Sequence, residues 1–126
     1  MEVMVSQEAV GSHAKADAVA HTKGTVERMT RGTTPDYVIT VEDMESLGNS
    51  TVYVTLRQGD VVVTKETDDL SIEGNQINVS LTQEETLAFT EGYAQMQVRG
   101  VTNGDAWASP IVDVPVKPVL LEEIIV

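Results

Sequence analysis

Residues 70–99 constrain the fold more than any other part of the chain, because two strongly alternating stretches flank a short helix-start motif. Apolar residues occupy every second position in both stretches: Ile77, Val79 and Leu81 in the first, and Ala94, Met96 and Val98 in the second. Alternation with a period of two predicts β-strands that place one face on a core and the other in water. We therefore expect two strands joined by a helical turn.

The helix-start motif is Thr82-Gln83-Glu84-Glu85, which has the spacing of a capping box. In such a box the Thr82 hydroxyl accepts a hydrogen bond from the backbone N–H of Glu85, and the Glu85 carboxylate accepts one from the N–H of Thr82. Two adjacent glutamates between strands could suggest acid–base chemistry. The spacing instead predicts that Glu85 caps the turn, and we expect this turn to carry the chain from one sheet to the other.

The rest of the chain repeats short strands and turns. Alternating stretches predict further strands at residues 37–41, 51–57, 61–66, 70–73 and 106–116. Tight hairpins are predicted at Gln58-Gly59-Asp60 and at Asn103-Gly104, where both residues tolerate positive φ. Pro110 and Pro115 place the last strand at a sheet edge, or at a bulge or sheet switch.

Seven or eight short strands at spacings of about 8–12 residues are typical of an all-β, immunoglobulin-like sandwich of antiparallel strands. True immunoglobulin domains contain a cysteine pair and a core tryptophan. This chain has no Cys, and its one Trp, Trp107, lies late in the sequence beside a hairpin. We therefore expect the disulfide-free variety, with a mainly aliphatic core.

The 126 residues have the length of one domain. We divide them into an N-terminal arm (1–31), the sandwich (32–118) and a C-terminal tail (119–126). Residues 1–10 could form an extended strand that pairs with another segment, and residues 14–21 could form a short helix. A helix that short is marginal in water, so the sequence favours an extended or partly helical arm, mobile or bound to a partner, over an integral element.

Charge and composition exclude several classes of function. The net charge is −12 with a pI near 4.3, and residues 1–31 are neutral, so the sandwich and tail carry all of it. Such a surface repels nucleic-acid phosphates and anionic membranes. The absence of Cys excludes disulfides, thiol catalysis and thiolate metal sites. We also see no signal-peptide pattern and no apolar run of membrane-spanning length.

Candidate metal ligands are few. The only histidines, His13 and His21, lie in the arm and are too far apart to share one ion without other ligands. A structural calcium ion at Asp68-Asp69, or around Asn103 and Asp105, is an alternative, although no spacing resembles an EF-hand. We therefore predict no metal-binding residue and no cofactor.

Candidate catalytic residues are equally few. No serine has a histidine placed to act as its base, and the carboxylate pair Glu122-Glu123, like Glu84-Glu85, lacks the aromatic cleft of a glycosidase. We predict no catalytic residue. Trp107 and Tyr93 favour half-buried cross-strand packing over a ligand platform.

Two further stretches, RGTTP at residues 31–35 and LTQEETLAF at residues 81–89, resemble a family of small immunoglobulin-like structural proteins of tailed phages and prophages. The resemblance extends through Gln58-Gly59-Asp60, the alternating strand from Ala94 and the Ser-x-Ile stretch at Ser109. It covers residues 29–126, and the domain is similar to the N-terminal module of phage upper baseplate proteins. No catalytic residues belong to the family pattern.

The resemblance implies a non-enzymatic virion protein, in the tail or baseplate region or as decoration on the capsid surface. Its implied partners are other phage structural proteins and copies of itself, as a homo-oligomer, with no nucleic acid and no membrane. We expect residues 1–28 and the tail from Val119 to contact neighbouring subunits, because such segments can add strands to open sheet edges.

Two other classes of function remain open. A carbohydrate- or receptor-binding adhesion module would need an exposed aromatic platform, for which the available residues are Tyr37, Tyr53, Tyr93 and Trp107. A hydrolase is the least favoured reading, because the residues for its chemistry are missing.

Overall fold

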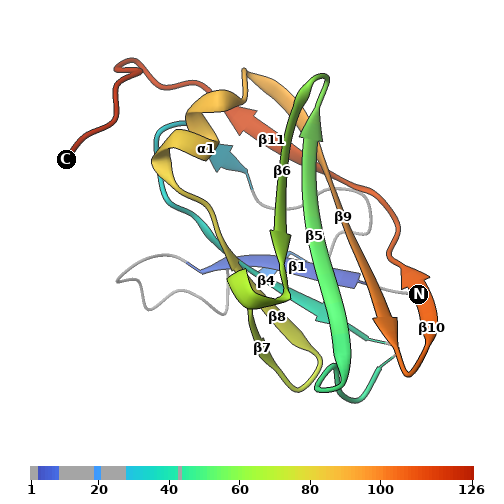
Figure 1. Cartoon of the computed structure of the whole chain (residues 1–126). Coiled ribbons are helices and arrows are strands. Elements are labelled where there is room, and N and C mark those ends of the chain that lie inside the picture. Colours follow the sequence, from blue (N-terminus) through green and yellow to red (C-terminus); the bar gives the residue numbers. More distant parts are fainter. Residues whose placement is uncertain (1–2, 9–18, 21–27, 43) are drawn as a thin grey trace.

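The computed structural model describes residues 3–8, 19–20, 28–42 and 44–126. Two β-sheets pack against each other in a sandwich, with one short helix at one end (Figure 1). The expected all-β sandwich is thus confirmed.

The first sheet has five strands, all paired antiparallel. Their spatial order is β2 (Val19–Ala20), β1 (Val3–Glu8), β4 (Asp36–Val41), β8 (Gln76–Ser80) and β7 (Ser71–Glu73). A 3-10 helix, η1 (Thr67–Asp69), precedes β7.

The second sheet has the order β3 (Met29–Thr30), β11 (Val112–Lys117), β9 (Gly92–Thr102), β5 (Ser50–Gln58) and β6 (Val61–Glu66), and β10 (Asp105–Ala108) also pairs with β9. Antiparallel pairing was expected throughout, but β3 and β11 run parallel. The long central pair β5–β9 is in register from Ser50 opposite Thr102 to Arg57 opposite Gln95.

The strand expected within residues 1–10 is present as β1, but the arm is an integral part of both sheets, where a mobile or partner-bound arm was favoured. β1 pairs with β4 over six residues, from Val3 opposite Val41 to Glu8 opposite Asp36. Met29 in β3 pairs with β11 and is fully buried. Both contacts cover sheet edges whose backbone groups would otherwise lack partners. Of residues 14–21, expected to form a helix, the structure describes only β2, which is a strand; His13 and His21 lie outside the described residues.

The expected strand at residues 106–116 is divided by a bulge. Ser109 is buried, and its hydroxyl accepts a hydrogen bond from the N–H of Val98 at 2.9 Å. In a regular strand pair a backbone carbonyl would accept this hydrogen bond. The N–H of Ser109 donates to the carbonyl of Val98 at 2.8 Å. Pro110 lies in this break. Of the expected alternatives, a sheet edge, a bulge or a sheet switch, the structure has the bulge here.

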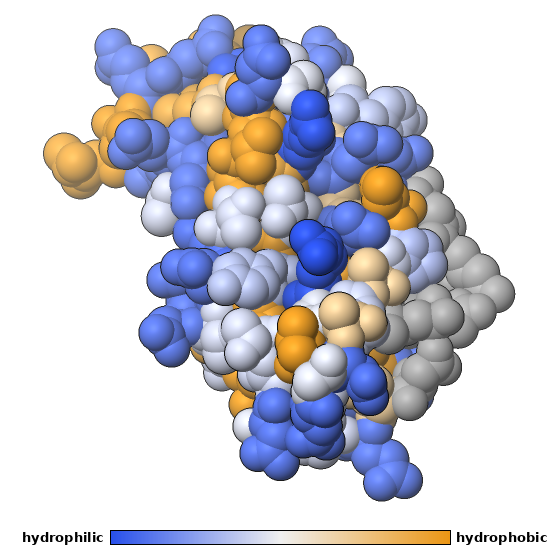
Figure 2. Space-filling model, turned by 45° about the vertical axis from the view of Figure 1, so that its right-hand side comes forward, coloured by the Kyte–Doolittle hydropathy of each residue, from blue (hydrophilic) through white to orange (hydrophobic). Residues whose placement is uncertain are grey.

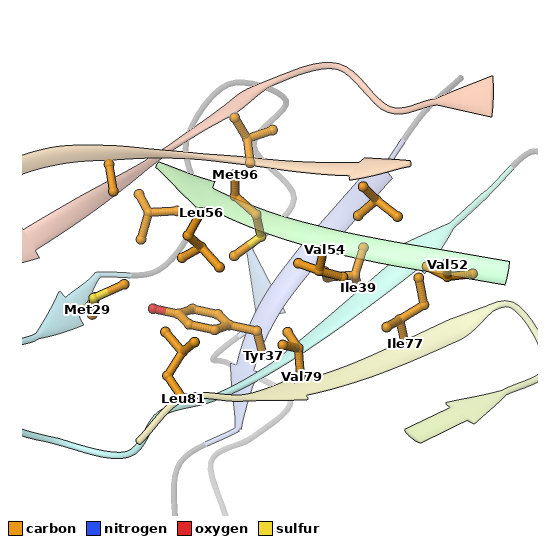
Figure 3. Close-up of a cluster of buried hydrophobic side chains, with 14 of the residues drawn as sticks. Met29, Tyr37, Ile39, Val52, Val54, Leu56, Ile77, Val79, Leu81 and Met96 are labelled. Carbon is orange, nitrogen blue, oxygen red and sulfur yellow. The ribbon is translucent and has the colours of Figure 1, made fainter. Parts of the chain in front are cut away.

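The core lies between the sheets and is aliphatic apart from Tyr37 and Phe89 (Figure 3). Its residues are those that the alternation pointed inward: Ile39 and Val41 of β4, Val52, Val54 and Leu56 of β5, Ile77 and Val79 of β8, Ala94, Met96 and Val98 of β9, and Val112, Val114 and Val116 of β11. In Figure 3 the Tyr37 ring lies in this layer between Leu56 and Leu81.

Helix α1 (Gln83–Ala88) joins β8 in the first sheet to β9 in the second, as expected. The N–H of Glu85 donates to the Thr82 hydroxyl at 3.1 Å, and the N–H of Thr82 donates to the Glu85 carboxylate at 2.8 Å. The predicted capping box is therefore confirmed. No helix in the described part of the chain is long and apolar enough to cross a membrane.

Candidate functional site

The two stretches that carry the family resemblance lie in contact, although they are about fifty residues apart in the sequence. The Leu81 N–H donates to the carbonyl of Pro35 at 3.1 Å, which joins the start of the helical turn to the end of RGTTP. The Arg31 guanidinium donates to the carbonyl of Leu87 at 2.9 Å, in the last turn of α1. A cation is favourable there, because the last carbonyls of a helix are unpaired and carry partial negative charge.

Thr86 is the centre of this junction. Its side chain is fully buried, and its hydroxyl accepts from the N–H of Gly32 at 3.0 Å while it donates to the carbonyl of Thr33 at 2.9 Å. One hydroxyl thus satisfies two backbone groups of a turn in which Gly32 adopts a positive φ of 78°. These hydrogen bonds give the junction a structural role, although the buried Nε of Arg31 has no hydrogen-bond partner.

The C-terminal tail is attached to the same junction. Glu122 forms an ion pair with Arg31 at 2.8 Å. The Gln83 side chain both donates to the carbonyl and accepts from the N–H of Ile125, each at 2.9 Å. These contacts hold the tail by its backbone and one charge, while its apolar side chains remain exposed.

Glu85, in the described part of the chain, has an environment that clearly shifts its pKa. Partial burial acts to raise its pKa, but hydrogen bonds from Lys65 and Thr82 and the charge of Lys65, whose ammonium lies 2.7 Å away, together hold the pKa of Glu85 below its usual value. This carboxylate is therefore ionised and engaged as a cap.

Substituting Glu85 by Gln should make stability less dependent on acid. Because the folded-state pKa is lowered, the carboxylate stabilises the fold above the ordinary glutamate pKa of about 4.3, and this stabilisation disappears as pH falls through the lowered value. Gln retains the capping geometry, so we expect a loss of about 1 kcal/mol or less at pH 7.

Denaturant unfolding of Glu85→Gln and wild type between pH 7 and pH 2 measures this difference. The two stabilities should converge in acid. Glu84→Gln, which removes the exposed neighbouring charge, should retain the wild-type acid dependence. A constant gap between Glu85→Gln and wild type across the whole range would contradict the assignment.

The residues considered as calcium ligands lie in a helix cap and in a hairpin. Asp69 accepts from the N–H of Glu66 at 3.1 Å and so caps η1 rather than facing Asp68. In the part of the chain that the structure describes, no group of three or more His, Asp or Glu side chains is arranged to hold a metal ion. Asn103 and Asp105 belong to the β9–β10 hairpin, where Asn103 has a positive φ of 52°.

The four aromatic residues considered for a ligand platform differ in burial. Tyr37 is fully buried and cannot contribute to a ligand platform. Trp107 is half-buried against the core, as expected, and its indole N–H donates to the Thr102 hydroxyl at 2.9 Å. Tyr93 was expected to be half-buried but is 65% exposed, and Tyr53 is 40% exposed.

Gly100 provides the space for Trp107. A methyl group at residue 100 would lie 2.4 Å from Cζ2 and 2.7 Å from Cε2 of the indole. Gly100→Ala should therefore displace the ring and cost about 1–3 kcal/mol of stability. Because Trp107 is the only Trp, a red shift of its fluorescence reports the displacement directly. In a Trp107→Ala background the same change should cost clearly less, because the close contact that remains is the Thr51 carbonyl at 3.0 Å; an equal cost in both backgrounds would refute the packing account.

Exposed apolar residues gather on one side of the sandwich. In the described part of the chain, five large ones lie outside the tail: Tyr53, Val62, Tyr93, Val101 and Ile111. The first four point outward from β5, β6 and β9, and Ile111 lies in the bulge before β11. We call this surface of the second sheet the outer face. Figure 2 shows apolar residues scattered among polar ones on this side of the molecule.

The outer face is shallowly hollowed along β5 and β9. One hollow of about 330 Å³ is lined by Thr51, Tyr53, Thr55, Thr64, Arg99, Gly100 and Val101. A second of about 310 Å³ is lined by Thr55, Arg57, Gln95, Met96, Gln97, Arg99 and Ile111. The two adjoin at Thr55 and Arg99, which line both, and we call them together the outer-face hollow.

Comparison with protein-family models and with curated protein sequences finds no match for this chain. Its function must therefore be argued from the surfaces themselves. In the described part of the chain, the outer face and the tail carry the exposed large apolar residues.

Proposed function

We propose that this chain is a non-enzymatic structural protein of the virion of a tailed bacteriophage, and that it assembles through its β-sandwich and terminal segments. The placement of the exposed apolar residues carries the proposal. In the described residues, five lie on the outer face and five on the tail: Leu120, Leu121, Ile124, Ile125 and Val126. The tail residues lie within seven positions of one another, and large exposed apolar patches mark interaction sites. The outer face adds five more, interspersed with polar residues, and two such surfaces on one small domain suit a subunit with several neighbours.

The strand order supports the immunoglobulin-like part of the proposal. The order β1-β4-β8-β7 corresponds to strands A, B, E and D of the immunoglobulin fold. The order β11-β9-β5 corresponds to G, F and C, with β6 in the place of C′. The contact between RGTTP and LTQEET also gives a physical reason for these stretches to occur together, since Thr86 bonds the backbone of Gly32 and Thr33.

The test is a prophage or phage in which the gene encodes a chain that ends at Pro118. Wild-type protein should co-purify with particles, and the shortened chain should be depleted from them at least tenfold. The tail contributes no residue to the buried core, so the shortened chain is expected to fold, and its melting temperature is the control. Full occupancy of the particles by the shortened chain would contradict assembly through the tail.

A carbohydrate- or receptor-binding adhesion module is the second candidate, favoured by the exposure of Tyr53 and Tyr93 on one face. Glycan-array binding by wild type, lost in Tyr53→Ala and in Tyr93→Ala, would favour it. Trp107→Ala is an informative comparison, because Trp107 is engaged in packing and should matter less.

A further inference from the structure

We propose that the tail (119–126) of one copy of this chain lies in the outer-face hollow of a second copy. The inference rests on the proposed assembly function and identifies one partner for both exposed apolar surfaces. It is carried by the apolar character, the length and the charge of the two surfaces.

The tail is suited to bind as an extended strand. In this structure the tail bends at Leu120 and Glu123. If it binds as an extended strand, in which successive side chains point to opposite sides, then Leu120, Ile124 and Val126 lie on one side with Glu122. These three side chains are 104%, 51% and 118% exposed. Within its own chain, the tail is held by Arg31 and by the Gln83 amide. These contacts leave most of the apolar surface of the tail in water.

The hollow has a matching length. It follows β9 from Gln95 to Val101, and seven residues of strand span about 23 Å at roughly 3.3 Å per residue. Eight extended residues of tail span about 26 Å by the same rise. The apolar residues along the hollow are Tyr53, Val101 and Ile111, which offer contact to the leucine and isoleucine side chains of the tail.

The charges of the two surfaces are complementary. The chain has only eight basic residues against twenty acidic ones, yet the charged residues that line the hollow are Arg57 and Arg99, both basic. Glu66 and Asp113 lie on the flanking strands β6 and β11, at the rim. The tail supplies Glu123, and also Glu122 once that carboxylate leaves its ion pair with Arg31. The net negative charge of the protein repels acidic segments elsewhere on its surface. The two arginines therefore favour the binding of the acidic tail in the hollow.

The geometry makes the contact head-to-tail. The tail leaves the sandwich beside α1, on the opposite side of Figure 1 from β10 and the end of β9. Each copy therefore donates a tail at one place and accepts a tail at another, which generates rings or filaments rather than a closed two-fold dimer. A single extended segment buries less than the roughly 800 Å² per partner of a standard interface, so association should be reversible and dependent on concentration.

Sedimentation velocity of the full chain tests the proposal with two complementary variants. The tail variant is Leu120→Asp/Ile124→Asp, and the hollow variant is Arg99→Glu/Val101→Asp. All four positions are exposed, and thermal unfolding checks that both variants remain folded. Lys117→Glu is the matched charge control, because Lys117 is exposed but does not line the hollow.

Wild type should associate with rising concentration, and each variant alone should need at least tenfold higher concentration. A mixture of the two variants should form a species of two copies and stop there, because one variant retains an intact tail and the other an intact hollow. Lys117→Glu should behave like wild type within twofold. A monomeric wild type, undiminished association of either variant, or a mixture that stays monomeric would each overturn the proposal. Presence of the protein in virions would then still support the proposed function, with a different partner for the tail.

Discussion

Leu56→Ala should lower the free energy of unfolding by about 3–5 kcal/mol, because a large side chain is removed from a fully buried site. Leu56 lies in the middle of the central strand β5, opposite Met96 of β9 and Val63 of β6. In Figure 3 it points between the sheets, toward the Tyr37 ring. Small domains are stable by only about 5–15 kcal/mol, so this one change removes a large share of the total.

The matched control is Val62→Thr, on the other side of the same sheet. Val62 is 54% exposed on the outer face, and exposed substitutions usually change stability by about 0.5 kcal/mol or less. Urea unfolding curves of both variants measure the difference. A large loss from Val62→Thr would mean that the outer face supports the fold of the single chain, and would weaken its assignment as a contact surface.

Thr86→Val should cost about 2–4 kcal/mol, although it preserves shape. The hydroxyl of Thr86 satisfies the N–H of Gly32 and the carbonyl of Thr33. Leaving a buried donor or acceptor without a partner costs about 1–3 kcal/mol for each group, and the lower part of the summed range applies because these two hydrogen bonds are only partly buried. Because Val supplies neither hydrogen bond, both backbone groups lose their partner at once.

Thr34→Val is the control for Thr86→Val, since Thr34 belongs to the same RGTTP stretch but is exposed. It should change stability by about 0.5 kcal/mol or less. Amide hydrogen exchange gives a second measure: protection of the Gly32 N–H should fall in Thr86→Val and stay unchanged in Thr34→Val. Equal stability of Thr86→Val and wild type would show that the junction does not hold the two stretches together.

Local patterns predicted the local structure well. Strands β5, β8 and β9, the hairpin at Asn103-Gly104 and both hydrogen bonds of the capping box follow from alternation and from neighbouring residues. The burial of Tyr37 could also be predicted from the sequence, because Tyr37 alternates in phase with Ile39 and Val41, which point inward. The same phase analysis finds Tyr53 and Val101 as apolar residues on the outward side of their strands.

The pairing of segments far apart in the chain was harder to predict from the sequence. Short segments such as β3 have no period to detect, and their pairing depends on which sheet edge they meet. The junction around Thr86 could not be predicted for the same reason. Nothing near Thr86 in the sequence indicates that its hydroxyl forms hydrogen bonds with Gly32 and Thr33. The set of residues that line the outer-face hollow depends on the register of β5 and β9, which brings Thr55 opposite Gln97 and Tyr53 opposite Arg99.

The measurement that most directly tests the proposed function is quantitative mass spectrometry of purified virions. A structural subunit should be present at a fixed copy number relative to the major capsid protein: a few copies for a tail or baseplate position, or hundreds for decoration of the shell. The same ratio should be found in independent preparations after density-gradient purification. Absence of the protein from purified particles would contradict the proposal.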